Sequence, residues 1–330
     1  MADQLRGARP SEVSDPVPAR SAQEVPLFFP AGDETLFGIL TRPTGSPNGT
    51  ALVVLAGGAT PITTNRNRLS VRLCRRVAGH GFHGMRLDYH GAGESSGMVE
   101  VMHLDRPFTG DPEGAMQWLR GYGIDDFVLV GSCFGSRTAL AAAAANPHVT
   151  RVVLVAPPVK DMAFGDWSSV QAADEWTIWK YVRRALSLNV LKGLFDRHHR
   201  LNYWRYVKHK WAAFRRRRAH KGREGPEWVS EHFLRQLRTL VDRGVPVFLL
   251  YGDGDAYYED FRRALMGPLG SVLDLAGPKI ELQTLPGRVH GFTRLSIQDA
   301  VLDKVVGWLL GDVASAAGPE TDVIAGNSSV

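Results

Sequence analysis

The side chain best placed for covalent chemistry in this 330-residue sequence is Cys133, at the centre of the segment G-S-C-F-G at positions 131–135. An apolar run at 127–130 precedes the segment, and a run of alanines follows it. A strand, a sharp turn and a helix in this order form the elbow that presents a catalytic nucleophile. Gly131 and Gly135 suit such a turn, because a Cβ at either position would meet the crossing backbone. The segment therefore predicts a nucleophilic cysteine; a buried cysteine in an ordinary turn is the alternative.

An acid and a base follow Cys133 in the chain order expected of a catalytic triad built on such an elbow. Residues 245–252 predict a buried strand, and Asp255 lies in the loop directly after it. Residues 279–285 predict another strand, and His290 lies in the loop that follows. A surface histidine bonded to backbone is the alternative for His290. A helix N-terminus and a neighbouring histidine would both favour the thiolate form of Cys133.

A glycine-rich loop supplies candidate donors for an oxyanion. Residues 51–56 predict a buried strand, which ends in Gly57, Gly58 and Ala59. An amide of Gly58 or Ala59 would join the Phe134 amide to form an oxyanion hole. A plain Gly-Gly turn is the alternative.

The order of these motifs resembles that of the α/β-hydrolase superfamily, over roughly residues 24–157 and 244–311. The loop at 88–97, D-Y-H-G-A-G-E-S-S-G, is similar to that family's D-x-x-G-x-G-x-S segment. The resemblance implies an α/β fold with a mostly parallel central sheet, flanking helices and a helical cap insertion. The family's common G-x-x-D pattern after Gly252 selects Asp255 rather than Asp253 as the acid of the triad.

Cysteine at the elbow is similar to dienelactone hydrolases and polyhydroxyalkanoate synthases, and the chain also resembles hydrolases associated with bacterial exosortase systems. The resemblance implies hydrolysis of an ester, lactone or thioester through an acyl-cysteine intermediate. An acyltransferase that uses a coenzyme A or carrier-protein thioester is the alternative, because a thiolate leaves more readily than an alkoxide. A non-catalytic, ligand-binding α/β-hydrolase fold is a second alternative.

A long insertion separates the two parts of the predicted core. Stripes of Trp, Val, Leu and Phe at helical spacing in this insertion predict cap helices, with an acyl-binding or membrane-facing surface as the alternative. The predicted domains are a disordered tail at 1–22, core at 23–157, a basic helical cap at 158–243, core at 244–312 and a disordered tail at 313–330.

The positive charge of the chain is concentrated in that insertion. Residues 180–224 contain fifteen Lys or Arg against two acids, whereas the whole chain carries a net charge of +5. The charge is densest at Arg215, Arg216, Arg217 and Arg218. A solvated helical face is one explanation. A substrate or partner surface is the other, for coenzyme A, an acidic acyl carrier protein or an anionic membrane that the chain contacts peripherally. We expect no nucleic-acid partner, because the fold offers no recognition element.

The composition predicts a soluble cytoplasmic enzyme that acts on a small-molecule acyl substrate. No apolar run is long enough to cross a bilayer, and the N-terminus lacks an apolar signal core. Two cysteines cannot form a disulfide framework, and Cys74 lies in a predicted amphipathic helix as a small core residue. No Cys/His cluster has metal-ligand spacing, so we expect neither a metal nor another cofactor.

Overall fold

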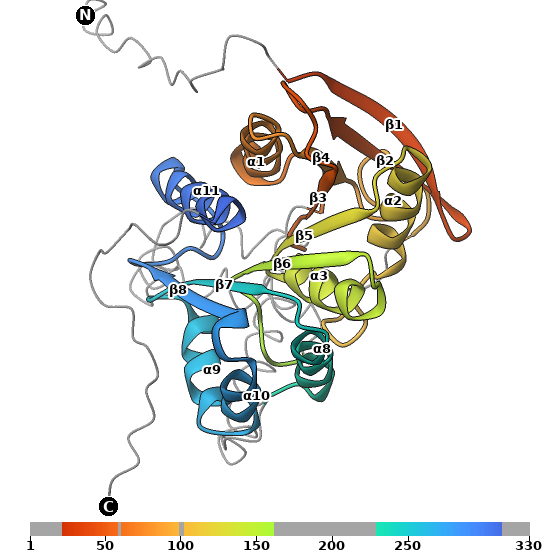
Figure 1. Cartoon of the computed structure of the whole chain (residues 1–330). Helices are drawn as coiled ribbons and strands as arrows, with labels where there is room; N and C mark the ends of the chain where they lie inside the picture. Colours follow the sequence, from red (N-terminus) through yellow and green to blue (C-terminus); the bar gives the residue numbers. More distant parts are fainter. Residues whose placement is uncertain (1–21, 59–60, 99–101, 162–228, 312–330) are drawn as a thin grey trace, which may run out of the picture.

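The computed structural model describes residues 22–58, 61–98, 102–161 and 229–311 (Figure 1). Their strands form one eight-stranded sheet in the order β1-β2-β4-β3-β5-β6-β7-β8. The strands are β1 (Glu24–Ala31), β2 (Glu34–Thr41), β3 (Thr50–Leu55), β4 (His83–Leu87), β5 (Asp126–Ser132), β6 (Val149–Val155), β7 (Val247–Gly252) and β8 (Ile280–Leu285). β2 is antiparallel to both of its neighbours, and the six strands from β4 to β8 along the sheet are parallel. The mostly parallel sheet predicted from the sequence is confirmed.

The central strands are apolar on both faces, because successive side chains of a strand point to opposite sides of the sheet. On β3, Val53 packs into one hydrophobic cluster, and its neighbours Leu52 and Val54 pack into the other. On β5, Leu129 and Val130 divide between the two clusters in the same way. A continuous apolar run therefore builds two cores, one on each side of the sheet.

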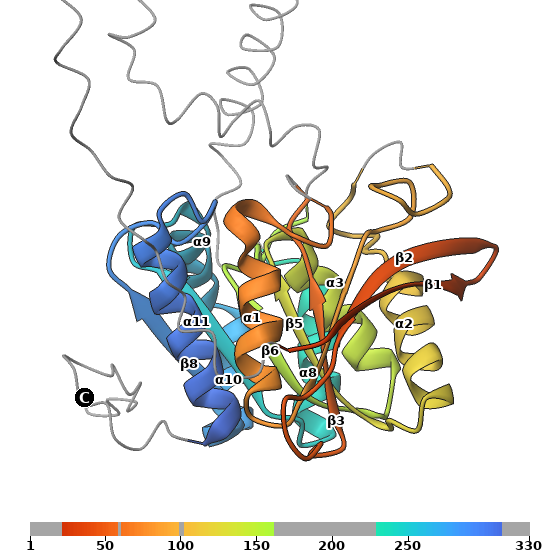
Figure 2. The ribbon, with the colours of Figure 1, turned by 90° about the horizontal axis from the view of Figure 1, so that it is seen from above.

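Helices cover both faces of the sheet and complete a three-layer arrangement (Figures 1 and 2). α1 and α11 lie side by side over one face, where Cys74 is fully buried as predicted. The other helices pack over the opposite face. The bounds are α1 (Leu69–Ala78), α2 (Gly110–Gly121), α3 (Phe134–Ala145), α8 (Glu231–Asp242), α9 (Ala256–Leu265), α10 (Pro268–Ala276) and α11 (Leu295–Leu310), with short 3₁₀ turns η1 (Arg66–Arg68) and η2 (Gly277–Lys279).

α8 lies within the residue range predicted for the cap insertion, yet it packs directly against α3. Its buried stripe consists of Phe233, Leu237 and Leu240. The spacing of these residues is that of one helix face. α8 therefore belongs to the layer of helices that covers the sheet.

Several predicted features lie outside the described residues. These are Ala59, most of the predicted cap (162–228) with Arg215 to Arg218, the C-terminal tail and nearly all of the N-terminal tail. Within the described ranges, no helix combines the length and apolar character that crossing a bilayer requires.

Candidate active site

Cys133 occupies a strained elbow between β5 and α3. Its backbone has φ 51° and ψ −116°, a conformation that a residue with a Cβ rarely adopts and that costs about 1 to 3 kcal/mol. Two backbone hydrogen bonds hold it: the Cys133 N–H donates to Val155 O of β6 at 3.0 Å, and the Ser136 N–H donates to Cys133 O at 3.0 Å. Backbone strain of this kind, held by surrounding contacts, is typical of a functional site.

The two glycines of the elbow are required by close backbone contacts. A Cβ on Gly131 would lie 2.1 Å from the carbonyl oxygen of Gly135. A Cβ on Gly135 would lie 2.2 Å from the carbonyl oxygen of Leu55 and 2.5 Å from that of Ala56, at the end of β3. The turn thus brings α3 against the strand that leads into the predicted oxyanion loop.

The loops after β7 and β8 meet through the Asp255 carboxylate. This buried carboxylate accepts hydrogen bonds from the backbone N–H groups of Gly252 at 3.0 Å, Val289 at 3.2 Å and His290 at 3.0 Å. Asp253 is exposed, and its carboxylate accepts from the Gly287 N–H at 2.6 Å instead. The structure therefore brings Asp255, and not Asp253, to His290.

His290 is a half-buried residue whose ring meets Tyr257 edge-on, with ring centroids 4.7 Å apart. Burial, and secondly the positive charge of Arg66, lowers the pKa of His290 to about 4. The imidazole is therefore neutral at physiological pH and able to accept a proton. For Asp255, burial raises the pKa of the carboxyl, while the three backbone donors and Arg288 oppose that rise.

Cys133 is itself buried, and its Sγ lies 3.6 Å from the hydroxyl oxygen of Tyr257. Burial raises the pKa of the Cys133 thiol to about 11, although hydrogen bonds from Tyr257 and from the Phe134 backbone N–H lower it. The expectation of a stabilised thiolate is therefore wrong for the resting site. Desolvation outweighs these two hydrogen bonds, so the thiol and the imidazole are both neutral at physiological pH.

The glycine-rich loop after β3 runs beside the elbow. A Cβ on Gly57 would lie 3.4 Å from Ser132 O and 3.6 Å from the Cβ of Cys133. Gly58 follows at the same edge of the sheet, and the Phe134 N–H is the first of helix α3. The two loops that were predicted to supply oxyanion donors therefore meet at Cys133.

Comparison with known proteins agrees with this geometry. The sequence matches the model of a family described as alpha/beta hydrolase fold over residues 61–260, more than half of the chain. The chain belongs to the alpha/beta hydrolase family. A search of curated proteins finds no match.

Solved structures show the same fold at low sequence identity. An esterase from Pyrococcus furiosus, Pf2001, is 14% identical with a TM-score of 0.57, over 88% of this chain and 93% of that one. The alpha/beta hydrolase GrgF from Penicillium sp. sh18 is 16% identical with a TM-score of 0.52, over 87% of this chain and 98% of that one.

In this alpha/beta hydrolase the loop at 88–97 has a structural role. The two Asp88 carboxylate oxygens accept from the Thr63 N–H at 2.5 Å and the Glu94 N–H at 3.0 Å. The Ser95 hydroxyl donates to Asp88 O at 2.8 Å. A Cβ on Gly93 would lie 2.0 Å from the Asp88 carboxylate, which explains a glycine there. Asp88 therefore fixes the chain just after the candidate oxyanion loop.

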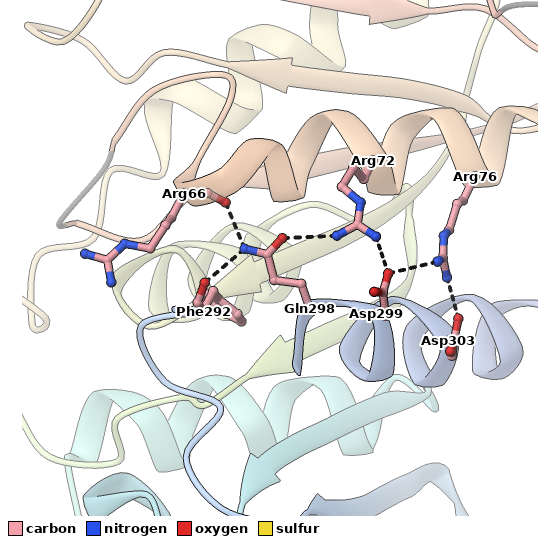
Figure 3. A network of polar contacts seen from close by, with 7 residues as sticks. All are labelled: Arg66, Arg72, Arg76, Phe292, Gln298, Asp299 and Asp303. Atoms are coloured by element: carbon pink, nitrogen blue, oxygen red, sulfur yellow. Dashed lines mark hydrogen bonds and ion pairs between the residues drawn. The ribbon is translucent and has the colours of Figure 1, made fainter. Parts of the chain in front are cut away.

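A buried amide, Gln298 of α11, holds the His290 loop against the segment before α1 (Figure 3). Its side-chain N–H groups donate to Phe292 O at 2.9 Å and Arg66 O at 3.1 Å, and its oxygen accepts from Arg72 at 3.2 Å. The Arg66 guanidinium donates to Gly291 O at 2.8 Å. Gln298 thus ties the chain two residues after His290 to the segment before α1.

The segment that Gln298 holds is strained. Asn65, Asn67, Arg68 and, in the His290 loop, Phe292 all have φ between 49° and 61°. Backbone in this region is unfavourable for residues with a Cβ and persists where surrounding contacts hold it. Gln298 was not predicted from the sequence, although a glutamine beside the stripe of Ile297, Val301 and Val305 is a signal of a buried polar contact.

Arg137 joins the two ends of the chain that flank residues 162–228. It lies one helical turn after Cys133, is almost completely buried, and packs over the ring of Phe233. Its guanidinium donates to Asp161 at 2.7 Å and to the Ser230 hydroxyl at 3.0 Å. Arg137 was not predicted from the sequence either, because it is the single charged residue of α3, among mostly small side chains.

Proposed function

We propose that this protein hydrolyses an ester, lactone or thioester through Cys133, His290 and Asp255, with an acyl-cysteine intermediate. The observation that carries the proposal is the strained backbone of Cys133 at the start of α3, with φ 51° and ψ −116°. A merely structural cysteine has no need of such a conformation, whereas a nucleophile is set by it at the end of the strand and the start of the helix.

The neutral thiol needs a general base that removes its proton during the attack. With the pKa of Cys133 raised to about 11 and that of His290 lowered to about 4, both groups are neutral at physiological pH. His290 takes the thiol proton as the sulfur attacks the carbonyl carbon, and the carbonyl π electrons move to oxygen. Asp255 stabilises the imidazolium that forms and fixes the position of His290 through its backbone N–H.

Backbone donors beside the elbow would stabilise the negative oxygen. The Phe134 N–H, at the first turn of α3, and an N–H from the loop at Gly58 and Ala59 would hold the oxyanion. Collapse of the tetrahedral species expels the alcohol or thiol of the substrate, which takes the proton from His290. Water, activated by the same imidazole, then hydrolyses the thioester to Cys133.

The chemistry of cysteine keeps acyl transfer as the second candidate. An acyl-cysteine is a thioester, which reacts with amines and alcohols as well as with water. Coenzyme A or carrier-protein thioesters would then be donors, with the basic residues Arg215 to Arg218 as the surface for their phosphates. Salt should weaken turnover of such donors and leave small neutral esters unaffected, because exposed charges are screened beyond about 8 Å.

The test is turnover of a panel of p-nitrophenyl esters, lactones and acyl thioesters by three proteins. The wild type and Cys74→Ala should hydrolyse at least one class at equal rates, because Cys74 is a buried core residue. Cys133→Ala should be inactive toward that class. Full activity in Cys133→Ala would refute the proposal. Addition of a primary amine or alcohol decides between hydrolysis and transfer by which product accumulates.

A further inference from the structure

We propose that Tyr257 is a fourth catalytic residue, whose hydroxyl stabilises the Cys133 thiolate while it forms and while it leaves. The inference rests on the proposed role of Cys133 as nucleophile. Its basis is contact with the reacting atom: the Tyr257 hydroxyl oxygen lies 3.6 Å from Cys133 Sγ, within hydrogen-bonding reach of sulfur.

The fold delivers Tyr257 to this place together with the acid. Asp255 is the N-cap of α9, and Tyr257 is two residues further, in the first turn of that helix. Its side chain is buried, and its ring packs edge-on against His290 at 84°. One short segment therefore contacts the base through Asp255 and the nucleophile through Tyr257.

The hydroxyl acts as a hydrogen-bond donor and keeps its own proton. When His290 removes the thiol proton, the S–H electron pair stays on sulfur, and only the O–H of Tyr257 can then donate between these two atoms. Burial and the neighbouring Cys133 raise the pKa of Tyr257 well above its ordinary value, so the phenol is not an acid here.

This hydrogen bond is stronger with a charged sulfur than with a thiol or thioester sulfur. It therefore favours the two transition states in which charge lies on sulfur, the attack on the substrate and the breakdown of the acyl-enzyme. An interaction that strengthens in the transition state raises the rate of the chemical step.

Other titratable groups interact electrostatically with Cys133, Tyr257 and His290. The buried Tyr89, in the loop after β4, interacts with Cys133. Charges of Asp255 and Asp260 act on Tyr257. Arg66 acts on His290. None of these groups changes in a variant that removes the Tyr257 hydroxyl alone.

The test is Tyr257→Phe, which removes the hydroxyl and keeps the ring against His290. Alkylation of Cys133 by iodoacetamide, followed by mass spectrometry of its peptide across a pH series, reports the thiolate directly. We expect the titration of Cys133 to move up by about one pH unit, and alkylation near neutral pH to slow about tenfold. Turnover should fall by a similar factor or more.

Tyr258→Phe is the matched control. Tyr258 is the next residue of the same helix, and its ring packs on Tyr251 and Phe261 instead. Its variant should alkylate and turn over as the wild type does. A second variant, with 3-fluorotyrosine at position 257, keeps the packing and strengthens the donor, so the titration of Cys133 should move down.

The outcomes separate the two proposals. A Tyr257→Phe protein that is folded and alkylates with the wild-type pH profile overturns the role of Tyr257, even where Cys133 is acylated by substrate. If Cys133→Ala retains turnover, the proposed function fails first, and the role of Tyr257 fails with it. If disturbed packing alone shifts the titration of Cys133, the shift in the 3-fluorotyrosine protein should have the same sign as in Tyr257→Phe. That result would also overturn the inference.

Discussion

Replacement of Gln298 by methionine should both destabilise the protein and slow its reaction. Methionine has nearly the length of glutamine and fills the same buried space, so the change removes the amide alone. Two backbone carbonyls, Phe292 O and Arg66 O, lose a donor at 2.9 Å and 3.1 Å. Phe292 O keeps a weaker donor, the Asn67 side chain at 3.3 Å.

The magnitude follows from these contacts. Arg66 O also keeps the Leu69 backbone N–H, so neither carbonyl is left without a donor. Each lost hydrogen bond then contributes about 0.5 to 1.5 kcal/mol, and the two together predict a loss of about 1 to 3 kcal/mol in the free energy of unfolding. Because the contact with Phe292 holds the chain two residues after His290, the folded variant should also lose about tenfold or more in kcat.

Urea unfolding, followed by tryptophan fluorescence, and steady-state kinetics at low urea measure the two effects. Asp303→Asn is the control, because it removes an exposed ion pair with Arg76 in the same interface. An exposed pair contributes about 0 to 1 kcal/mol, and this one lies far along α11 from the His290 loop. A Gln298→Met protein as stable and as active as Asp303→Asn would refute the role of Gln298.

Three further outcomes are expected. Asp255→Asn should reduce kcat/KM by orders of magnitude, and Asp253→Asn far less, because of these two carboxylates it is that of Asp255 that contacts His290. A larger loss of kcat/KM in Asp253→Asn would exchange the roles of the two residues. Because burial lowers the pKa of His290 to about 4, the imidazole stays neutral, and kcat/KM should hold level down to about pH 5 and fall below that. A pH–rate profile with an acid limb near the ordinary pKa of histidine would contradict this expectation. Gly135→Ala should abolish activity and lower the melting temperature, because its Cβ would lie 2.2 Å from the β3 backbone. In the control Gly307→Ala, in α11, the added Cβ meets no atom within 4 Å, so activity should be unchanged and stability unchanged or slightly higher. Equal melting temperatures of the two variants would argue against the close contact at the elbow.

The parallel sheet and the elbow could be predicted because local patterns determine them. Apolar runs without alternation mark strands that are buried on both faces, and the glycines at 131 and 135 mark a turn that excludes any Cβ. The hairpin of β1 and β2 was not predicted. Its residues alternate only partly, with Phe28 exposed at the edge of the sheet.

The parts of the site that sequence reasoning missed depend on contacts between distant segments. Tyr257 could be recognised only once α9 brought its hydroxyl to Cys133 and its ring against His290. The pKa of Cys133 was misjudged because the helix N-terminus and the histidine are visible in the sequence, whereas the depth of burial is not. Gln298 and Arg137 are likewise ordinary residues until the fold shows which carbonyls and carboxylates they bond.

The most direct test of the central claim is the site of acylation. Wild-type protein is mixed with an acyl thioester or activated ester, quenched with acid within the first turnover, digested and analysed by tandem mass spectrometry. We predict one acyl group on the sulfur of Cys133, released by hydroxylamine. An acyl group on the adjacent Ser132 or on any other residue, or turnover without any covalent adduct in the wild type or in Asp255→Asn, would contradict a cysteine-based acyl-enzyme.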